Sequence, residues 1–150
     1  MFSLGKSKNI ITNLLSNGGV VVLPTDTIYS LSCLITKNKS LKRILEIKGR
    51  DISKGIPVLI PHKDYFYKYA ENINSACDLL IDTFMPGGLT LIVRKKPFIS
   101  NIISGNTDNI AIRIPDDPNL IKIMSTIKSG ITGTSANISG KEHSLLEENL

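Results

Sequence analysis

Short apolar runs alternate with segments of helical spacing, and this alternation limits the fold more than any other feature of the sequence. The runs are rich in Val, Ile and Leu and cover residues 20–23, 56–60, 89–93 and 110–114, and residues 131–134 are expected to form a last short strand. Runs of this length and composition predict strands of a sheet that is covered by helices. The first run is apolar throughout, so we expect it to be buried on both faces. Pro57 weakens the second run, which we expect to lie at a sheet edge or to begin late.

Four segments carry apolar residues at the three- and four-residue spacing of a helix face. They cover residues 10–15, 41–45, 77–84 and 120–127, and Ser40 is expected to cap the second of them. No helical pattern separates 89–93 from 110–114, so the strands do not follow a strict strand–helix–strand order. We therefore predict an α/β fold in which a twisted mixed sheet carries helices on its faces.

The length of 150 residues favours a single domain that spans residues 1–150. Cys33 and Cys77 lie far apart in the sequence, and His62 and His143 are isolated, so the sequence predicts neither a disulfide framework nor a metal site. The first residues lack the apolar stretch of a signal peptide, and no apolar run approaches membrane-spanning length. We expect a cytoplasmic protein that has no membrane partner.

The positive charge of the chain is concentrated between residues 37 and 54. The net charge of +5 indicates an anionic partner, for which the phosphates of a nucleotide would suffice. Cations at 37–43 fit a solvated helix face. Lys48, Arg50 and Lys54, interleaved with glycines that allow close backbone approach, suit a polyphosphate, although cations at a helix C-terminus are also favoured by its dipole. The chain has neither a GxxxxGK[ST] nor a GxGxxG motif, which disfavours two common nucleotide-binding folds.

Three further polar features follow or end predicted strands, where ligands of open α/β sheets usually bind. Thr25, Asp26 and Thr27 could form a turn or cap, or could hold an amine or hydroxyl of a substrate. Arg113 faces away from the isoleucines of its strand, so it is either a solvent-facing residue or a bidentate partner for a carboxylate. The Ser/Thr/Gly-rich segment 132–140 is either an ordinary loop or a nest of backbone donors for an anion.

Six blocks of sequence, in this order, resemble the motifs of the YrdC-like family of threonylcarbamoyl-AMP synthases. They are Pro-Thr-Asp-Thr-Ile-Tyr-Ser-Leu at 24–31, Lys-Gly-Arg at 48–50, Lys-Gly at 54–55, Pro-Gly-Gly-Leu-Thr at 86–90, Arg-Ile-Pro at 113–115 and Ser-Ala-Asn-Ile-Ser-Gly at 135–140. The blocks span most of the chain. Ser30 stands where the family usually has glycine, and we expect backbone strain there if that position needs a positive φ.

The resemblance implies an activity and its reactants. Family enzymes join L-threonine with bicarbonate or CO₂ and use ATP, with Mg²⁺ on the nucleotide, to form threonylcarbamoyl-AMP and pyrophosphate. A tRNA threonylcarbamoyl transferase complex then receives the product for the t6A modification of tRNA, so contact with RNA or tRNA is also implied. The same resemblance implies that the chain is C-terminally short, because family members continue with a further strand and helix.

The resemblance also assigns roles to residues. Thr27, Arg113 and the backbone near Gly133 are implied threonine contacts. Lys48 and Arg50 are implied catalytic residues, and the implied ATP contacts are Lys48, Arg50, Lys54, Asn109, Ser135, Asn137 and His143.

Two other functions stay open for the same fold. One is a non-catalytic module that binds double-stranded RNA on a basic face, which the net charge permits. The other is a carbamoyl-transfer domain like the YrdC-like part of hydrogenase maturation factors, although such domains are normally embedded in much longer chains.

Overall fold

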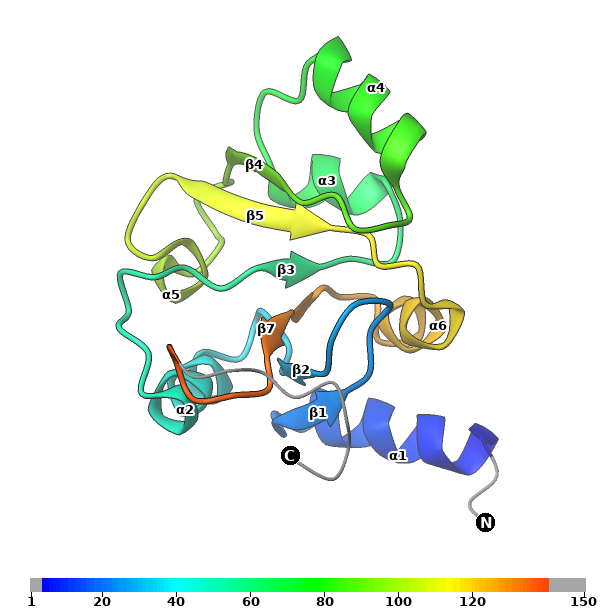
Figure 1. Cartoon of the computed structure of the whole chain (residues 1–150), viewed down its shortest axis with the longest axis vertical. Helices are drawn as coiled ribbons and strands as arrows, with labels where there is room; N and C mark the ends of the chain where they lie inside the picture. The colour runs from blue at the N-terminus through cyan, green and yellow to red at the C-terminus, as the bar shows by residue number, and fades with distance from the viewer. Residues whose placement is uncertain (1–3, 141–150) are drawn as a thin grey trace.

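The computed structural model describes residues 4–140 (Figure 1). Its helices are α1 (Leu4–Ser16), α2 (Asn38–Lys48), α3 (Asp64–Tyr69), α4 (Ser75–Phe84), α5 (Asn101–Ser104) and α6 (Pro118–Ile127). Its strands are β1 (Val21–Leu23), β2 (Ser30–Ser32), β3 (Val58–Leu59), β4 (Leu91–Arg94), β5 (Asn109–Arg113), β6 (Ile131–Thr132) and β7 (Thr134–Ser135). None of the helices within this part of the chain has the length and apolar character needed to span a membrane.

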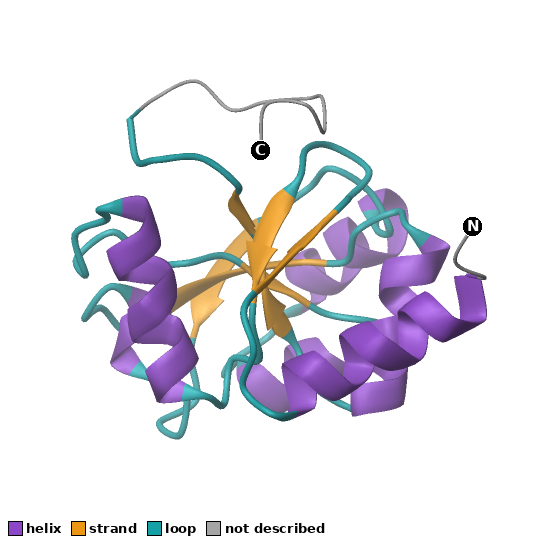
Figure 2. Cartoon of the chain, turned by 90° about the horizontal axis from the view of Figure 1, so that it is seen from below, coloured by secondary structure: helices purple, strands orange, loops and turns teal. Residues whose placement is uncertain are grey.

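The strands form two sheets that share one stretch of chain. The smaller sheet is antiparallel with the order β1-β2-β7, and the larger has the order β4-β5-β3-β6, in which β3 and β5 are parallel. Only Gly133 separates β6 from β7, so the chain passes there from the larger sheet to the smaller one. Helices lie on both sides of the strands in Figure 2. The α/β fold with a mixed sheet and helices on its faces is thereby confirmed, although the strands form two sheets where one was predicted.

Strand β5 shows how the alternating sequence sets the two faces of the larger sheet. Ile110, Ile112 and Ile114 are buried, with at most 5% of each residue exposed, whereas Ala111 and Arg113 point to the opposite face. The apolar face packs into a core built mainly from Ile, Leu and Val, which also contains the fully buried Phe66. Arg113 is therefore placed by the sheet on the face that the core leaves free.

The structure corrects the expectations for the first strand and the second helix. Val22 in β1 is 45% exposed, so burial on both faces is wrong, because β1 forms the edge of a three-stranded sheet. Ser40 does not cap α2, which begins at Asn38. Its hydroxyl instead donates to the carbonyl oxygen of Gly18 at 2.6 Å and so ties α2 to the turn before β1.

The structure also tests the expectations for Pro57 and for Ser30, which stands where the family usually has glycine. The strand after Pro57 begins late, at Val58, as expected, but it lies inside the larger sheet rather than at its edge. Ser30 lies in β2 and is not among the positive-φ residues of the described chain, so the expected strain does not arise. Its buried hydroxyl lies 2.8 Å from that of Ser32.

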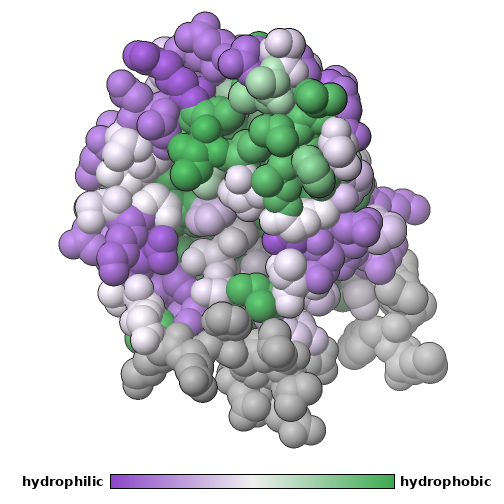
Figure 3. Space-filling view, turned by 45° about the horizontal axis from the view of Figure 1, so that its top comes forward, coloured by the Kyte–Doolittle hydropathy of each residue, from purple (hydrophilic) through white to green (hydrophobic). Residues whose placement is uncertain are grey.

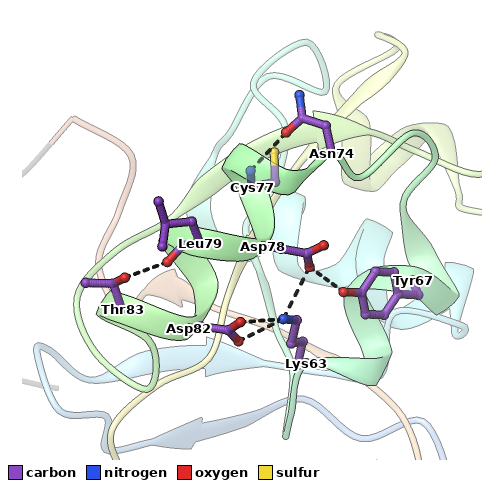
Figure 4. Close-up of polar contacts among 8 residues, drawn as sticks. All are labelled: Lys63, Tyr67, Asn74, Cys77, Asp78, Leu79, Asp82 and Thr83. Atoms are coloured by element: carbon purple, nitrogen blue, oxygen red, sulfur yellow. Dashed lines mark hydrogen bonds and ion pairs between the residues drawn. The ribbon is translucent and has the colours of Figure 1, made fainter.

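Helix α4 is held between a buried isoleucine and a polar cluster. Ile81 is 2% exposed and faces the core. On another side of the helix, the Lys63 ammonium contacts both carboxylate oxygens of Asp82 at 2.8 Å and Asp78 at 3.3 Å, and Tyr67 donates to Asp78 (Figure 4). These contacts raise the pKa of Lys63, chiefly through the hydrogen bond to Asp82.

The solvent side of α4 is apolar rather than polar. Leu79, Leu80 and Phe84 are 68%, 37% and 56% exposed, although Leu80 and Phe84 were expected on the buried face. Apolar side chains gather on this side of the molecule in Figure 3. The helix therefore has apolar residues on two faces, of which only the one with Ile81 is covered in the described chain.

Candidate functional site

Arg113 is the centre of a polar contact between the two sheets. At the end of β5, its Nε donates to the carbonyl oxygen of Gly87 at 2.7 Å, and its Nη1 donates to the hydroxyl of Thr27 at 3.0 Å. Its Nη2 lies 2.5 Å from Asp26, and the two side chains are only 12% and 15% exposed. That buried nitrogen makes no well-aligned hydrogen bond among the described residues, so the contact with Asp26 is an ion pair. The guanidinium has five N–H groups, more than these three contacts use, so Arg113 has the capacity to bind a carboxylate as well.

The segment between β1 and β2 is shaped by Thr25. Its hydroxyl donates to the carbonyl oxygen of Ile28 at 2.7 Å and accepts from the backbone N–H groups of Thr27 and Ile28, each at 3.2 Å. The turn predicted as one of two alternatives is therefore present, and β2 rather than a helix follows it. This turn also holds Asp26 and Thr27 against Arg113. The same residues can therefore form the turn and offer groups to the amine or hydroxyl of a substrate.

Lys48 ends α2 and is almost fully buried, with 1% of the residue exposed. Its ammonium donates to the backbone oxygen of Ser135, to the backbone oxygen of Asn137 at 2.8 Å and to the side-chain oxygen of Asn137 at 3.0 Å. Burial, and next the nearby charge of Arg50, lower the pKa of Lys48. All three ammonium hydrogens therefore have acceptors within the protein.

The loop at 135–139 joins Lys48 to the turn that precedes β2. The hydroxyl of Ser135 donates to the side-chain oxygen of Asn137 at 2.6 Å, and the N–H of Ala136 donates to the carbonyl oxygen of Tyr29 at 2.9 Å. The N–H of Ser139 donates back to the carbonyl oxygen of Lys48 at 2.8 Å. One continuous set of contacts thus runs from Lys48 to the segment that holds Thr27.

Gly133 is required by the packing at the junction of the two sheets. A Cβ at this position would lie 2.6 Å from the Cγ atom of Leu59, which is closer than side chains approach. The backbone N–H of Gly133 donates to the carbonyl oxygen of Pro57 at 2.8 Å. Gly133 directly precedes β7 and so lies near the loop at 135–139. Its own N–H is used in the bond to Pro57 and is not free for a ligand.

Arg50 and Lys54 lie on the segment that follows α2. Arg50 donates from Nε to the carbonyl oxygen of Lys54 and from Nη2 to that of Gly55, both at 2.9 Å. These two bonds curl the segment, and Gly55 packs against the backbone of α5, where a Cβ would lie 2.9 Å from the oxygen of Ile103. The side chain of Lys54 is exposed. Of the three cations expected at the phosphates, Arg50 and Lys54 therefore retain free donors.

Asn109 lies apart from Arg113, and His143 lies outside the described residues. Asn109 begins β5 and Arg113 ends it, so about 13 Å of extended strand separates them. Asn109 is exposed and follows α5, against which the Gly55 segment packs. Apart from Asn109, the predicted residues that the structure describes fall into two groups. One group surrounds Arg113 and the other surrounds Lys48 and Arg50, and the Tyr29–Ala136 hydrogen bond joins them.

The burial of Lys48 and the contact of Gly87 with Arg113 were not predicted. A signal for the first was present, because Lys48 follows Leu41 and Ile44 at helical spacing and so continues the buried face of α2. The contact of Gly87 has no local signal, since it depends on how the loop before β4 packs on β5.

Comparison with known proteins gives a consistent result. The profile of the Sua5/YciO/YrdC family, described as "Telomere recombination", matches residues 13–149. The chain is 31% identical over 132 residues to the threonylcarbamoyl-AMP synthase of Histophilus somni, which covers 87% of this chain and 72% of that protein. It is 40% identical over 126 residues to a Methanocaldococcus jannaschii protein that carries the same name provisionally, covering 84% of this chain and 58% of the relative.

A solved structure is similar over nearly the whole chain. The crystal structure of Pyrococcus abyssi Sua5 complexed with L-threonine has a TM-score of 0.89 and 29% identity, covering 95% of this chain and 42% of that one. The chain thus spans 58% of the M. jannaschii relative and less than half of the P. abyssi protein. Since the profile match covers most of the sequence, the chain belongs to the Sua5/YciO/YrdC family.

Proposed function

We propose that the chain is an L-threonylcarbamoyladenylate synthase. The reaction joins L-threonine, bicarbonate or CO₂, and ATP, and it yields threonylcarbamoyl-AMP and pyrophosphate. One water is also released when the carbon comes from bicarbonate. The observation that carries the proposal is the cluster of Arg113, Asp26 and Thr27, which offers a guanidinium, a carboxylate and a hydroxyl within one contact network. Family relatives bear the name of this enzyme, and one related structure holds L-threonine.

The Arg113 cluster matches the groups of an amino acid. A guanidinium binds a carboxylate with two parallel hydrogen bonds, and the bonds to Gly87 and Thr27 already fix its plane. The carboxylate of Asp26 could accept a hydrogen bond from the amine, and the hydroxyl of Thr27 could bond to either polar end. Because Arg113 belongs to the larger sheet, and Asp26 and Thr27 to the turn between two strands of the smaller one, the fold sets their separation before the ligand binds.

ATP would be bound by the second group of residues. Arg50 and the exposed Lys54 supply positive charge for the phosphates, and the loop at 135–139 supplies polar groups beside them. The carbamate oxygen, formed from the threonine amine and CO₂, attacks the α-phosphorus of ATP. The bond from that phosphorus to the bridging oxygen breaks, and pyrophosphate leaves. Such a displacement needs positioning and charge stabilisation rather than a protein nucleophile.

We propose that Mg²⁺ enters with the nucleotide. Among residues 4–140, no three His, Cys, Asp or Glu side chains are grouped as metal ligands. This fits a cation that keeps several waters and is held mainly by substrate phosphates. We further propose that a tRNA threonylcarbamoyl transferase complex receives the product, because a mixed carbamic–phosphoric anhydride is a reactive carbamoyl donor.

The proposal is tested by pyrophosphate release. The 150-residue chain should release pyrophosphate only when ATP, Mg²⁺, threonine and bicarbonate are all present. Arg113→Ala should lose the activity, and Arg50→Ala should lose most of it at an ATP concentration near the wild-type KM, because Arg50 is proposed to bind the phosphates. Arg43→Ala is the matched control, because Arg43 is exposed on α2 and pairs only with Glu46 at 3.2 Å.

The alternative of an RNA-binding module would give a different result. If the wild-type chain releases no pyrophosphate but binds duplex RNA with an affinity that falls steeply with salt, the synthase proposal is wrong.

A further inference from the structure

Lys48 is a buried cation whose partners are all polar groups of one loop. Its three acceptors belong to Ser135 and Asn137, and no carboxylate of the described residues forms an ion pair with it. A buried charge is tolerated only where hydrogen bonds compensate for lost hydration. Here the oxygen dipoles of the loop provide that compensation.

The same residue also holds the far end of the loop. The N–H of Ser139 donates to the carbonyl oxygen of Lys48 at 2.8 Å, so both the backbone and the side chain of Lys48 contact the loop. Resonance keeps the peptide unit planar and trans, so its N–H points opposite to its C=O. Because the carbonyl of Asn137 points at the ammonium, the N–H of Ile138 points away from it. Among the described residues, that N–H has no hydrogen-bond partner.

From these contacts we infer that Lys48 is a positioning residue, which holds the loop at 135–139 in shape, and that it is not a ligand of the phosphates. This inference rests on the proposed function for what the loop then does. Lys48 holds the carbonyl groups of Ser135 and Asn137 toward its ammonium. The N–H of Ile138 and the polar side chains of Ser135 and Asn137 therefore have fixed positions before ATP binds. Positive charge at the phosphates then comes from Arg50 and Lys54.

A direct phosphate contact would require Lys48 to give up one of its present acceptors. The ammonium has three hydrogens, and three loop oxygens lie within hydrogen-bond distance of its nitrogen. Releasing one oxygen would leave a polar group of the loop without its donor, at a position where Lys48 itself is 1% exposed. Arg50 carries no such constraint, since its donors contact only the segment at 54–55 and leave Nη1 free among the described residues.

The inference is tested first without any substrate. Amide hydrogen exchange of Ala136 and Ser139 is measured by NMR in the wild type, in Lys48→Met and in Arg50→Ala. Lys48→Met should raise exchange at both amides by on the order of tenfold or more, because the loop loses its anchor. Arg50→Ala should leave both rates unchanged, since the side-chain hydrogen bonds of Arg50 go to Lys54 and Gly55 rather than to the loop. Unchanged exchange in Lys48→Met would overturn the inference.

A wild-type measurement covers the case in which Lys48→Met does not fold. The side-chain nitrogen resonance of Lys48 is followed while ATP and Mg²⁺ are added. A positioning residue keeps its three loop acceptors, so the resonance should stay where it is in the free protein. A large shift of this signal on adding ATP would show a phosphate contact and contradict the inference.

Kinetics separates this inference from the proposed function. If the chain is a synthase, Lys48→Met should lower kcat about 10²-fold through the misplaced loop, whereas Arg50→Ala should mainly raise KM for ATP. An effect of Lys48→Met on the KM for ATP alone would contradict the positioning role. Absence of pyrophosphate release in the wild type would end the proposed function, but the exchange result would still decide how Lys48 acts.

Discussion

Arg113 of β5 lies 2.5 Å from Asp26 of the turn between β1 and β2, so a largely buried ion pair joins the two sheets. The hydrogen bond from Arg113 to Thr27, at 3.0 Å, reinforces the same junction. Substitution of Arg113 would leave Asp26 as a largely buried charge without this partner, which is more costly than loss of an exposed pair. The site and the stability of the sheet junction are therefore coupled.

A first prediction concerns threonine binding at this pair. L-Threonine should raise the melting temperature of the wild type, because a ligand that binds only the folded state stabilises it. Arg113→Ala should remove this shift, and Arg113→Lys should retain little of it, since an ammonium cannot replace the planar fork. The measurement is a thermal melt over a threonine titration, with Arg43→Ala as control. An undiminished shift in Arg113→Ala would exclude this arginine from the carboxylate site.

A second prediction concerns Gly105, where the segment with Lys54 packs on α5. Gly105 has φ +63°, and a Cβ there would lie 2.6 Å from the backbone nitrogen of Gly55 and also clash with the oxygen of Ser53. Gly105→Ala should therefore lower the free energy of unfolding by more than about 1 kcal/mol in urea. Gly88→Ala is the control, because nothing lies within 4 Å of its Cβ position. Equal stability of the two variants would argue against this packing.

A third prediction separates the two anchors of α4. Ile81→Ala should lower the free energy of unfolding by about 2–5 kcal/mol, because it removes a fully buried side chain from the core. Lys63→Met should change stability little, because the contacts of Lys63 with Asp78 and Asp82 are exposed to solvent. Urea denaturation followed by circular dichroism measures both. A larger loss in Lys63→Met than in Ile81→Ala would reverse this ranking.

A fourth prediction concerns the two thiols. Cys33 is fully buried, and burial raises the pKa of its thiol to about 12, whereas Cys77 is half-buried on α4. The thiolate is the reactive form, so Cys33 should stay protonated and unreactive at pH 8 in the folded protein. A thiol-reactive dye should label Cys77 first and Cys33 only after unfolding. Fast labelling of native Cys77→Ser, in which Cys33 is the remaining thiol, would contradict the buried environment.

The alternation of the sequence was enough to predict most elements and the face on which Arg113 lies. The isoleucines of β5 have a strict two-residue period, which fixes the orientation of the arginine without any tertiary information. Strand β2 could not be predicted, because its sequence Ser-Leu-Ser lacks an apolar run and its pairing with β1 and β7 is a tertiary property. Helix α5 has four residues, too few to show a helical period.

The sequence places the candidate residues on particular strands and helices, but it does not give the contacts between them. Local sequence placed Thr27 and Arg113 at strand ends, but only the folded chain brings their side chains within 3.0 Å. The three cations at 48, 50 and 54 suggested equal roles, yet the position of Lys48 on the buried face of α2 gives it different partners. Spacing along the chain does not distinguish a cation that contacts a loop from one that is free for a ligand.

The most direct test of the synthase proposal is the fate of isotope-labelled bicarbonate. The wild-type chain is incubated with ATP, Mg²⁺, L-threonine and ¹³C-bicarbonate, and the nucleotides are analysed by mass spectrometry. The proposal predicts an adenylate that contains both threonine and one ¹³C atom, formed together with pyrophosphate and absent in Arg113→Ala. Formation of unlabelled AMP or ADP alone, or a nucleotide product that does not require threonine, would contradict it.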